Sequence, residues 1–203
     1  MDAVNYWSDQ KVIPVVTIHE ADQAVSLART LSAVGLNKIE ITLRTPAALK
    51  AVMQISQEVP GAIVGAGTVL NISMADQAIR AGAKFLVSPG CTPELLKYLK
   101  DGSVPFLPGC ATVSEAMYLM DNDVTVAKFF PAEDSGGLNF LRSISSVLGA
   151  IKFCPTGGVT MSNYKNYLEL PNVVCVGGSW IAPSSEITAG EWERIGENAL
   201  AVL

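Results

Sequence analysis

Histidine and paired cysteines are scarce in this chain of 203 residues. It contains one histidine, His19, and four cysteines, none of them in a CxxC pair. Zinc and iron centres usually draw several ligands from these two residue types. The composition therefore excludes most metal-centre chemistry, and we expect neither a metal nor another cofactor. We expect Cys91, Cys110, Cys154 and Cys175 to be small, mostly buried side chains in a reducing compartment.

Positive charge and long apolar runs are also in short supply. Lys and Arg number 14 against 19 Asp and Glu, which gives a net charge of −5. Nucleic-acid binding needs a basic excess to neutralise phosphates, and no apolar stretch approaches the roughly 20 residues of a membrane-spanning helix. Residues 1–10 lack the basic start and apolar stretch of a secretory signal. We therefore expect a cytoplasmic protein that binds neither nucleic acid nor membrane.

Apolar residues are abundant, at 49%, and they follow a repeating order. Short β-branched runs alternate with segments of helical pattern, and no linker divides them, so one domain over residues 1–203 is expected. The predicted strands span residues 12–18, 38–42, 62–68, 85–88, 104–107, 124–129, 151–155 and 173–177. The predicted helices span residues 20–34, 46–59, 73–81, 93–100, 113–120, 138–148, 162–168 and 192–202.

This repeat of eight strand–helix units predicts an α/β fold, a (β/α)8 TIM barrel. A doubly wound open sheet is the alternative, but eight strands in so short a chain favour closure. Residues 1–10, which include Trp7, are predicted to form an extra N-terminal helix across the bottom of the barrel. In such a barrel the active site lies where the strands end.

A lysine stands near the end of the sixth predicted strand, among apolar residues. Alternation places Lys128 on the same face as Val124 and Val126, opposite to Ala127 and Phe129. Lysine is almost never buried without a reason. Loss of hydration favours the neutral amine, which is the form that attacks a carbonyl to make a Schiff base. The alternatives are a lysine whose charged end reaches the rim, or one paired with a carboxylate.

The second predicted strand carries a glutamate between two isoleucines. Glu40, Thr42 and Arg44 share one face by alternation. Strands 2 and 6 contribute to the same interior layers, so Glu40 can face Lys128 across the barrel. The pair is then either a structural salt bridge or a proton shuttle beside an imine-forming lysine. Arg44, just past the strand, can clamp a substrate carboxylate with its planar fork, although it can equally be a surface residue.

Paired glycines follow the last two predicted strands. Thr156-Gly157-Gly158 closes the seventh, and Gly177-Gly178-Ser179 closes the eighth. Barrels often bind phosphate at these two loops, where glycine lets the backbone approach an oxyanion. Two such pairs at these two positions are moderately specific, because glycine pairs also serve tight turns.

Five segments together resemble one enzyme family. They are Glu40-Ile-Thr-Leu-Arg44, Gly65-Ala-Gly-Thr-Val69, Lys128-Phe-Phe-Pro-Ala132, Pro155-Thr-Gly-Gly158 and Gly177-Gly-Ser-Trp180. Over essentially its whole length the chain is similar to the 2-keto-3-deoxy-6-phosphogluconate (KDPG) aldolases. That family includes enzymes that also cleave 4-hydroxy-2-oxoglutarate (KHG). The resemblance implies a metal-independent class I aldolase that forms homotrimers of (β/α)8 barrels.

The resemblance also implies a role for each site residue. Lys128 is the Schiff-base lysine and Glu40 is the acid/base residue. The remaining site residues hold the pyruvate carboxylate (Arg44 and Thr68), line the pocket (Pro89 and Phe130) or take the phosphate end (Thr156, Gly157, Gly158 and Ser179, with Gly178 beside them). Two departures, Cys110-Ala111 and His19, fall at the aldehyde end and leave the core chemistry untouched.

The implied reaction is cleavage of KDPG to pyruvate and glyceraldehyde 3-phosphate, with KHG, which gives pyruvate and glyoxylate, as a second candidate substrate. In it Lys128 forms an imine at C2, and Glu40, through a water, removes the C4 hydroxyl proton. Two other functions stay open at this point. One is an epimerase or isomerase of sugar phosphates, and the other is a non-catalytic member that binds a phosphorylated acid.

Overall fold

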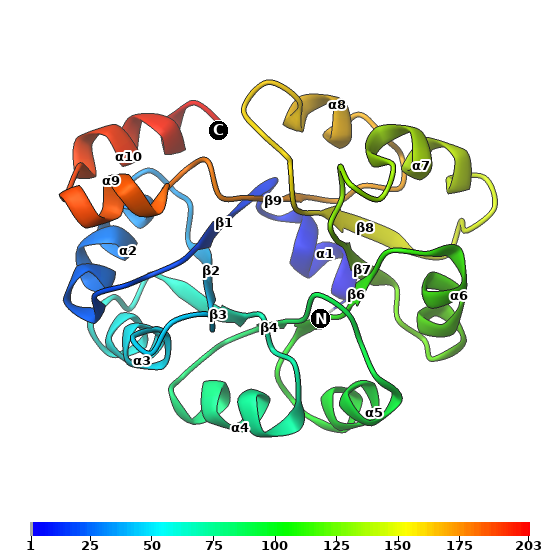
Figure 1. Ribbon diagram of the computed structural model, residues 1–203, viewed down its shortest axis with the longest axis horizontal. Coiled ribbons are helices and arrows are strands. Elements are labelled where there is room, and N and C mark those ends of the chain that lie inside the picture. The colour runs from blue at the N-terminus through cyan, green and yellow to red at the C-terminus, as the bar shows by residue number, and fades with distance from the viewer. Residues whose placement is uncertain (1) are drawn as a thin grey trace.

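Every predicted strand has a counterpart in the computed structural model, which describes residues 2–203 (Figure 1). The strands are β1 (Val12–Val16), β2 (Lys38–Thr42), β3 (Ile63–Gly67), β4 (Leu86–Val87), β5 (Phe106–Leu107), β6 (Gly109–Cys110), β7 (Val126–Phe129), β8 (Lys152–Pro155) and β9 (Val176–Gly178). The helices are α1 (Ala3–Ser8), α2 (Ala24–Ala33), α3 (Ala48–Glu58), α4 (Ile72–Arg80), α5 (Pro93–Asp101), α6 (Val113–Asp121), α7 (Gly137–Ile144), α8 (Tyr164–Leu168), α9 (Ser184–Ala189) and α10 (Trp192–Leu200).

The strands pair in parallel and close into a ring. One sheet has the order β5-β4-β3-β2-β1-β9, and a second has the order β6-β7-β8. β5 and β6 are one barrel strand interrupted at Pro108, whose carbonyl still accepts the backbone N–H of Lys128 at 2.8 Å. Single bridges between Thr156 and Gly177 and between Phe153 and Val173 join the other edges. The predicted eight-stranded barrel is confirmed, and the doubly wound open sheet is wrong.

Some boundaries differ from the prediction. The helix predicted over residues 20–34 opens as a 3₁₀ turn, Ala21–Gln23, before α2. The N-terminal helix covers Ala3–Ser8 rather than residues 1–10, and Met1 lies outside the described residues. α9 was not predicted, because its six residues, which follow Pro183, are too few to show an apolar period. It ends at Gly190, whose left-handed φ of 70° suits a glycine C-cap.

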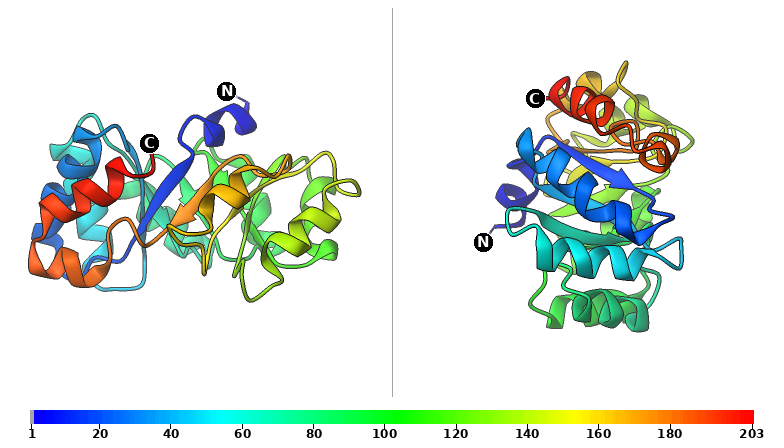
Figure 2. Two further views of the ribbon diagram at one scale, coloured as in Figure 1. Left: turned by 90° about the horizontal axis from the view of Figure 1, so that it is seen from above. Right: turned by 90° about the vertical axis from the view of Figure 1, so that its left-hand side faces the viewer.

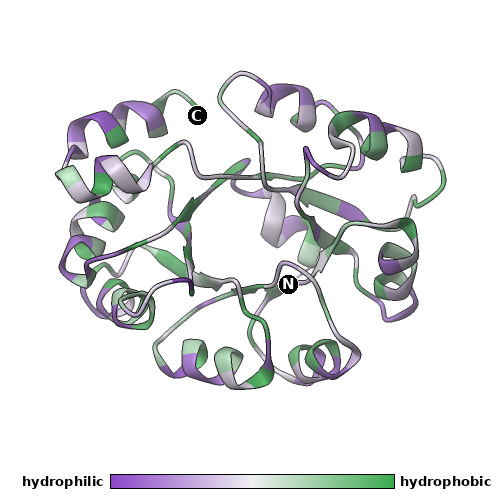
Figure 3. Cartoon of the chain, viewed as in Figure 1, coloured by the Kyte–Doolittle hydropathy of each residue, from purple (hydrophilic) through white to green (hydrophobic). Residues whose placement is uncertain are grey.

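Apolar side chains fill two separate layers, one inside the ring and one between the ring and the helices. Val126 packs in the interior with residues such as Ile13 and Phe85. Ala127 and Phe129, on the other face of β7, pack in the outer layer under the helices. Figure 3 shows the matching pattern, with hydrophilic residues on the outward faces of the helices. Val124 departs from the predicted alternation because it precedes β7, and it packs in the outer layer.

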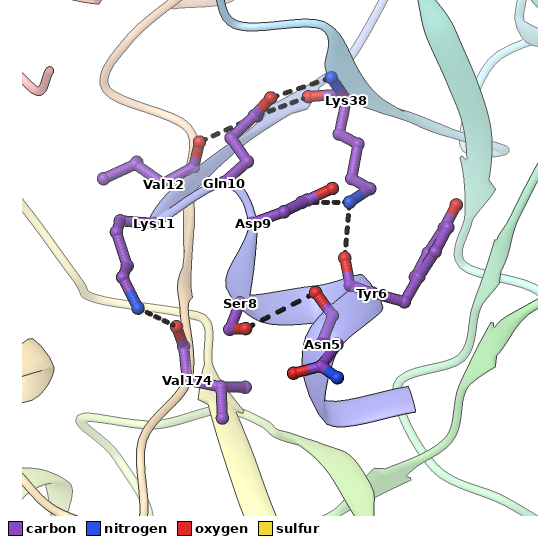
Figure 4. A network of polar contacts seen from close by, with 9 residues as sticks. All are labelled: Asn5, Tyr6, Ser8, Asp9, Gln10, Lys11, Val12, Lys38 and Val174. Atoms are coloured by element: carbon purple, nitrogen blue, oxygen red, sulfur yellow. Dashed lines mark hydrogen bonds and ion pairs between the residues drawn. The ribbon is translucent and has the colours of Figure 1, made fainter. Parts of the chain in front are cut away.

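Helix α1 closes the end of the barrel where the strands begin (Figure 2). Trp7 is 1% exposed and packs edge-on against Phe85, with 5.4 Å between ring centroids. Lys38, at the start of β2, is equally buried and binds the Tyr6 carbonyl and the Asp9 carboxylate (Figure 4). α1 thus packs across this end, and barrels of this kind bind their ligands at the opposite end, where the strands terminate.

Candidate active site

A buried lysine and a buried glutamate meet inside the barrel. Lys128 Nζ on β7 lies 3.2 Å from Glu40 Oε1 on β2, and each side chain is 4% exposed. The prediction that these two residues face each other across the barrel is confirmed. A carboxylate at this distance can take a proton from the ammonium group, which frees the amine as a nucleophile, and can return it to a bound molecule.

Gly67 on β3 makes room for this glutamate, and the sequence analysis did not identify it. A Cβ built on Gly67 would lie 2.0 Å from Glu40 Oε1 and 2.7 Å from the carboxyl carbon. Any side chain at position 67 would therefore displace the Glu40 carboxylate. The available signal was a glycine inside a predicted strand, which often marks a close approach of another group.

An arginine without an acidic partner stands at the mouth of the barrel. Arg44 is exposed and forms no ion pair within residues 2–203. Its Nε donates to Thr68 Oγ1 at 3.1 Å, so the two terminal nitrogens remain for a carboxylate. Thr68 has a φ of 61°, which is rare for a β-branched residue and costs about 1–3 kcal/mol. Such strain is typical of a functional position, and the structure brings Arg44 and Thr68 together as predicted.

A cavity of about 460 Å³ opens between the ends of β1, β8 and β9. It brings together Thr17, Gly158 and Ser179, while its apolar wall includes Trp180 and Pro183. Gly157 and Gly158 have left-handed φ angles of 95° and 76°, which glycine adopts without strain. Among residues 2–203, no lysine or arginine lines the cavity, so an oxyanion there would be held by neutral donors.

Of the residues predicted to take the phosphate or to line the pocket, five do not line this cavity: Gly157, Phe130, Thr156, Gly178 and Pro89. Phe130 lies against both parts of the site: its ring centroid is 5.4 Å from Lys128 Nζ, and a Cβ on Gly157 would touch it at 3.3 Å. Thr156 is buried beneath Gly177, where a Cβ would lie 2.3 Å from its hydroxyl oxygen. A Cβ on Gly178 would collide with the Trp180 ring at 2.5 Å. Pro89, after β4, contacts Gly109 of β6.

Three residues that the sequence analysis did not identify hold the Gly157-Gly158 loop. Asn163 Nδ2 donates to Glu133 Oε1 at 3.2 Å, and the Tyr167 hydroxyl donates to the same oxygen. Burial, together with the neighbouring carboxylate, raises the pKa of Tyr167, so its hydroxyl stays a donor. A Cβ on Gly158 would lie 2.5 Å from Glu133 Cγ. These contacts join segments that are far apart in the chain, so the sequence could not show them. Only Glu133 could have been suspected as a site residue, because it lies shortly after the end of β7.

A second cavity, of about 500 Å³, lies at the opposite end of the barrel. It is lined by Tyr6 and Trp7 of α1 and by Phe106 and Val126. Its charged residues, Lys100 and Asp123, pair with each other at 3.3 Å. Their side chains are 35% and 92% exposed, so this pair is not desolvated as Lys128 and Glu40 are, and the larger cavity is not the candidate active site.

The residues that depart from the family pattern also lie at the ends of strands. Cys110 ends β6 and is buried, and burial, with Glu115 nearby, raises its pKa to about 12. Burial likewise raises the pKa of Cys91 to about 11. These thiols are therefore protonated near neutral pH and are poor nucleophiles. His19 is exposed just beyond β1.

Comparison with known proteins identifies the family. The family described as "Aldolase: KDPG and KHG aldolase" matches residues 4–198. A 2-dehydro-3-deoxy-phosphogluconate aldolase of Dickeya dadantii (strain 3937) is 47% identical over 184 residues, which make up 91% of this chain and 86% of that protein. A KHG/KDPG aldolase of Escherichia coli (strain K12) is 46% identical over 184 residues, with the same coverage of 91% and 86%.

A solved structure gives the same answer. The crystal structure of a KDPG aldolase from Legionella pneumophila holds pyruvate, captured at low pH, as a covalent carbinolamine intermediate. It matches this chain with a TM-score of 0.96 at 42% identity, covering 100% of this chain and 98% of the other. The resemblance inferred from the five sequence segments is thereby confirmed. This chain belongs to the KDPG and KHG aldolase family.

Proposed function

We propose that this protein is a class I aldolase that cleaves KDPG to pyruvate and glyceraldehyde 3-phosphate and also accepts the shorter KHG. One observation carries the proposal: the Lys128 amine is buried at the active end of the barrel, 3.2 Å from the Glu40 carboxylate. Membership of the family supports the same reaction. A sugar-phosphate epimerase or isomerase would need a pair of acid/base groups but no nucleophilic lysine.

The mechanism begins with attack of Lys128 Nζ on the C2 carbonyl of the substrate. Loss of water from the carbinolamine gives an iminium, which is the electron sink of the reaction. Glu40 accepts the proton of the C4 hydroxyl, the C3–C4 bond breaks, and its electrons form an enamine as the aldehyde leaves. Protonation at C3 and hydrolysis then release pyruvate and restore the amine. Arg44 and Thr68 hold the C1 carboxylate during these steps.

Borohydride trapping tests this function. Incubating the protein with pyruvate and sodium borohydride should add one reduced pyruvate to a peptide that contains Lys128. Pyruvate release from KDPG, followed with a coupled dehydrogenase, should occur in the same preparation. An unlabelled protein that nevertheless binds a phosphorylated acid would identify a non-catalytic member. Label on a lysine other than Lys128 would assign the nucleophile to another position.

We propose that the cavity after β8 and β9 takes the phosphate of KDPG. Its lining offers the backbone amide of Gly158 and the hydroxyl of Ser179, and Gly157 precedes Gly158 in the same loop. Ser179→Ala should raise KM for KDPG about tenfold, because a hydrogen bond to a charged group contributes about 1.5–3 kcal/mol. KM for KHG, which has no phosphate, should stay unchanged in a steady-state assay.

Ser143→Ala is the matched control, because that hydroxyl lies on α7 and donates only to the Asn139 carbonyl, at 2.8 Å. Equal losses on both substrates in Ser179→Ala would mean that Ser179 shapes the rim and does not bind phosphate. Substitution of Gly158 is a poorer probe, because a Cβ there would collide with Glu133 whether or not a ligand is bound.

We also propose that the chain is one barrel domain that assembles as a homotrimer in the cytoplasm. Exposed apolar side chains on α6, which are Val113, Met117 and Tyr118, support a protein–protein interface. No helix within residues 2–203 has the length and apolar character needed to cross a membrane. Light scattering coupled to size exclusion should give three chain masses, and Met117→Glu should reduce the mass to that of one chain.

A further inference from the structure

Thr17 occupies a particular place in the barrel, between the catalytic pair and the phosphate cavity. It follows β1 on the interior face, since it shares parity with Ile13, which packs inside the ring. Val15 pairs in register with Glu40, so Thr17 stands beside Thr42, one layer nearer the mouth. Thr17 also lines the cavity that contains Gly158 and Ser179.

The hydrogen bonds around Thr17 determine which way its hydroxyl points. Thr42 Oγ1 donates to the Val16 carbonyl at 3.1 Å, and a threonine hydroxyl has only one proton to give. Thr17 Oγ1 lies 2.9 Å from Thr42 Oγ1. Either hydroxyl can donate in this contact; with the Thr42 proton given to the Val16 carbonyl, the donor is Thr17. The oxygen of Thr17 is left with lone pairs and no proton for the cavity.

This acceptor differs from the donors in the same cavity. The loops after β8 and β9 offer the Gly158 amide and the Ser179 hydroxyl. An oxygen with only lone pairs repels a phosphate or carboxylate oxygen, but it accepts a hydrogen bond from an alcohol. The cavity therefore combines a subsite for an anion with acceptors that recognise a hydroxyl. Thr17 is the one beside Thr42, while Ser184, whose own proton goes to the Thr17 carbonyl at 3.3 Å, is a second.

We propose that Thr17 is a specificity-determining residue that accepts a hydrogen bond from a substrate hydroxyl lying between the cleaved bond and the phosphate. In KDPG this is the C5 hydroxyl, which becomes the hydroxyl of glyceraldehyde 3-phosphate. The inference rests on the proposed function, because it places C4 near Glu40 and the phosphate near Ser179. It predicts that the site takes phosphorylated aldehydes that carry a hydroxyl next to the carbonyl in preference to deoxy aldehydes.

The test compares two aldehydes as acceptors of pyruvate in the synthetic direction: glyceraldehyde 3-phosphate and 3-phosphonooxypropanal, which lacks the hydroxyl. Thr17→Val keeps the shape of the side chain and the bond from Thr42 to Val16. It should lower kcat/KM for glyceraldehyde 3-phosphate about threefold to tenfold, the range for one neutral hydrogen bond, and leave the deoxy aldehyde unchanged. The separate variant Thr17→Ser, which retains the hydroxyl, should keep the wild-type preference for the hydroxylated aldehyde.

Borohydride trapping of pyruvate, which does not involve the aldehyde half, should be the same in wild type and Thr17→Val and so reports on folding. Equal changes for the two aldehydes in Thr17→Val, or none for either, would overturn the assignment of Thr17. A wild-type protein that forms no bond between pyruvate and either aldehyde would instead overturn the proposed function itself.

Discussion

Lys128→Met is expected to remove the borohydride-trapped pyruvate adduct and to lower the rate of KDPG cleavage by roughly 10⁴-fold or more. That magnitude is typical when the group that forms a covalent intermediate is lost. Methionine has nearly the length of lysine but no amine, so it can pack among the same neighbours without attacking the C2 carbonyl. Mass spectrometry of the reduced protein and a coupled assay of pyruvate release measure the two losses.

Loss of Lys128 also leaves the Glu40 carboxylate buried without its partner, at 4% exposure. An uncompensated buried charge costs about 3–5 kcal/mol, so the single variant should unfold at a lower temperature. The double variant Lys128→Met with Glu40→Gln removes that charge and should recover stability without recovering activity. This comparison separates a missing nucleophile from a damaged fold.

Lys38 supplies a matched control from the same chain. It is also a buried lysine paired with a carboxylate, that of Asp9, but it lies at the closed end of the barrel (Figure 4). Lys38→Met should weaken the attachment of α1 yet keep both the pyruvate adduct and KDPG cleavage. An adduct that disappears in Lys38→Met and persists in Lys128→Met would place the nucleophile at the wrong end of the barrel for this mechanism.

The sequence predicted the placement of Lys128 and Glu40 because two simple rules determine it. Strand alternation fixes which face of the sheet each side chain occupies. In an eight-stranded barrel, alternate strands contribute to the same interior layer, and Glu40 and Lys128 lie on the second and sixth barrel strands (β2 and β7). The same alternation failed at Val124, which lies outside β7 and so does not follow the strand's period. Prediction was accurate where the regular backbone geometry alone decides the answer.

Features that depend on contacts between distant segments could not be predicted in this way. Gly67 is next to Glu40 only because β3 pairs with β2 in a particular register. The direction of the Thr17 hydroxyl depends on a proton that Thr42 gives to Val16, which no local pattern encodes. In both cases the sequence shows a suitable residue type, and the three-dimensional structure supplies its partner.

Glu40→Gln is expected to lower kcat for KDPG cleavage about 10²- to 10⁴-fold, the usual contribution of a positioned general base. Glutamine has the same shape and can still contact Lys128 Nζ and fit beside Gly67, so the substitution changes the proton chemistry with little change in packing. Its amide cannot take the proton of the C4 hydroxyl, and the C3–C4 bond then breaks slowly.

Trapping separates the two roles assigned to this carboxylate. If Glu40 acts on the C4 hydroxyl, Glu40→Gln still forms the pyruvate adduct at Lys128, and only the cleavage rate is lost. If it serves chiefly to free the amine of Lys128, adduct formation and cleavage fall together. An unchanged kcat in Glu40→Gln would mean that the Lys128–Glu40 pair is only a structural salt bridge. An amide cannot act as a base, so full activity with glutamine would show that the reaction needs no base at position 40. Glu40, 3.2 Å from Lys128 Nζ, can serve both steps only if its carboxylate accepts a proton first from the Lys128 ammonium group and later from the C4 hydroxyl. The loss of adduct formation compared with the loss of cleavage in Glu40→Gln measures how much each step depends on this carboxylate.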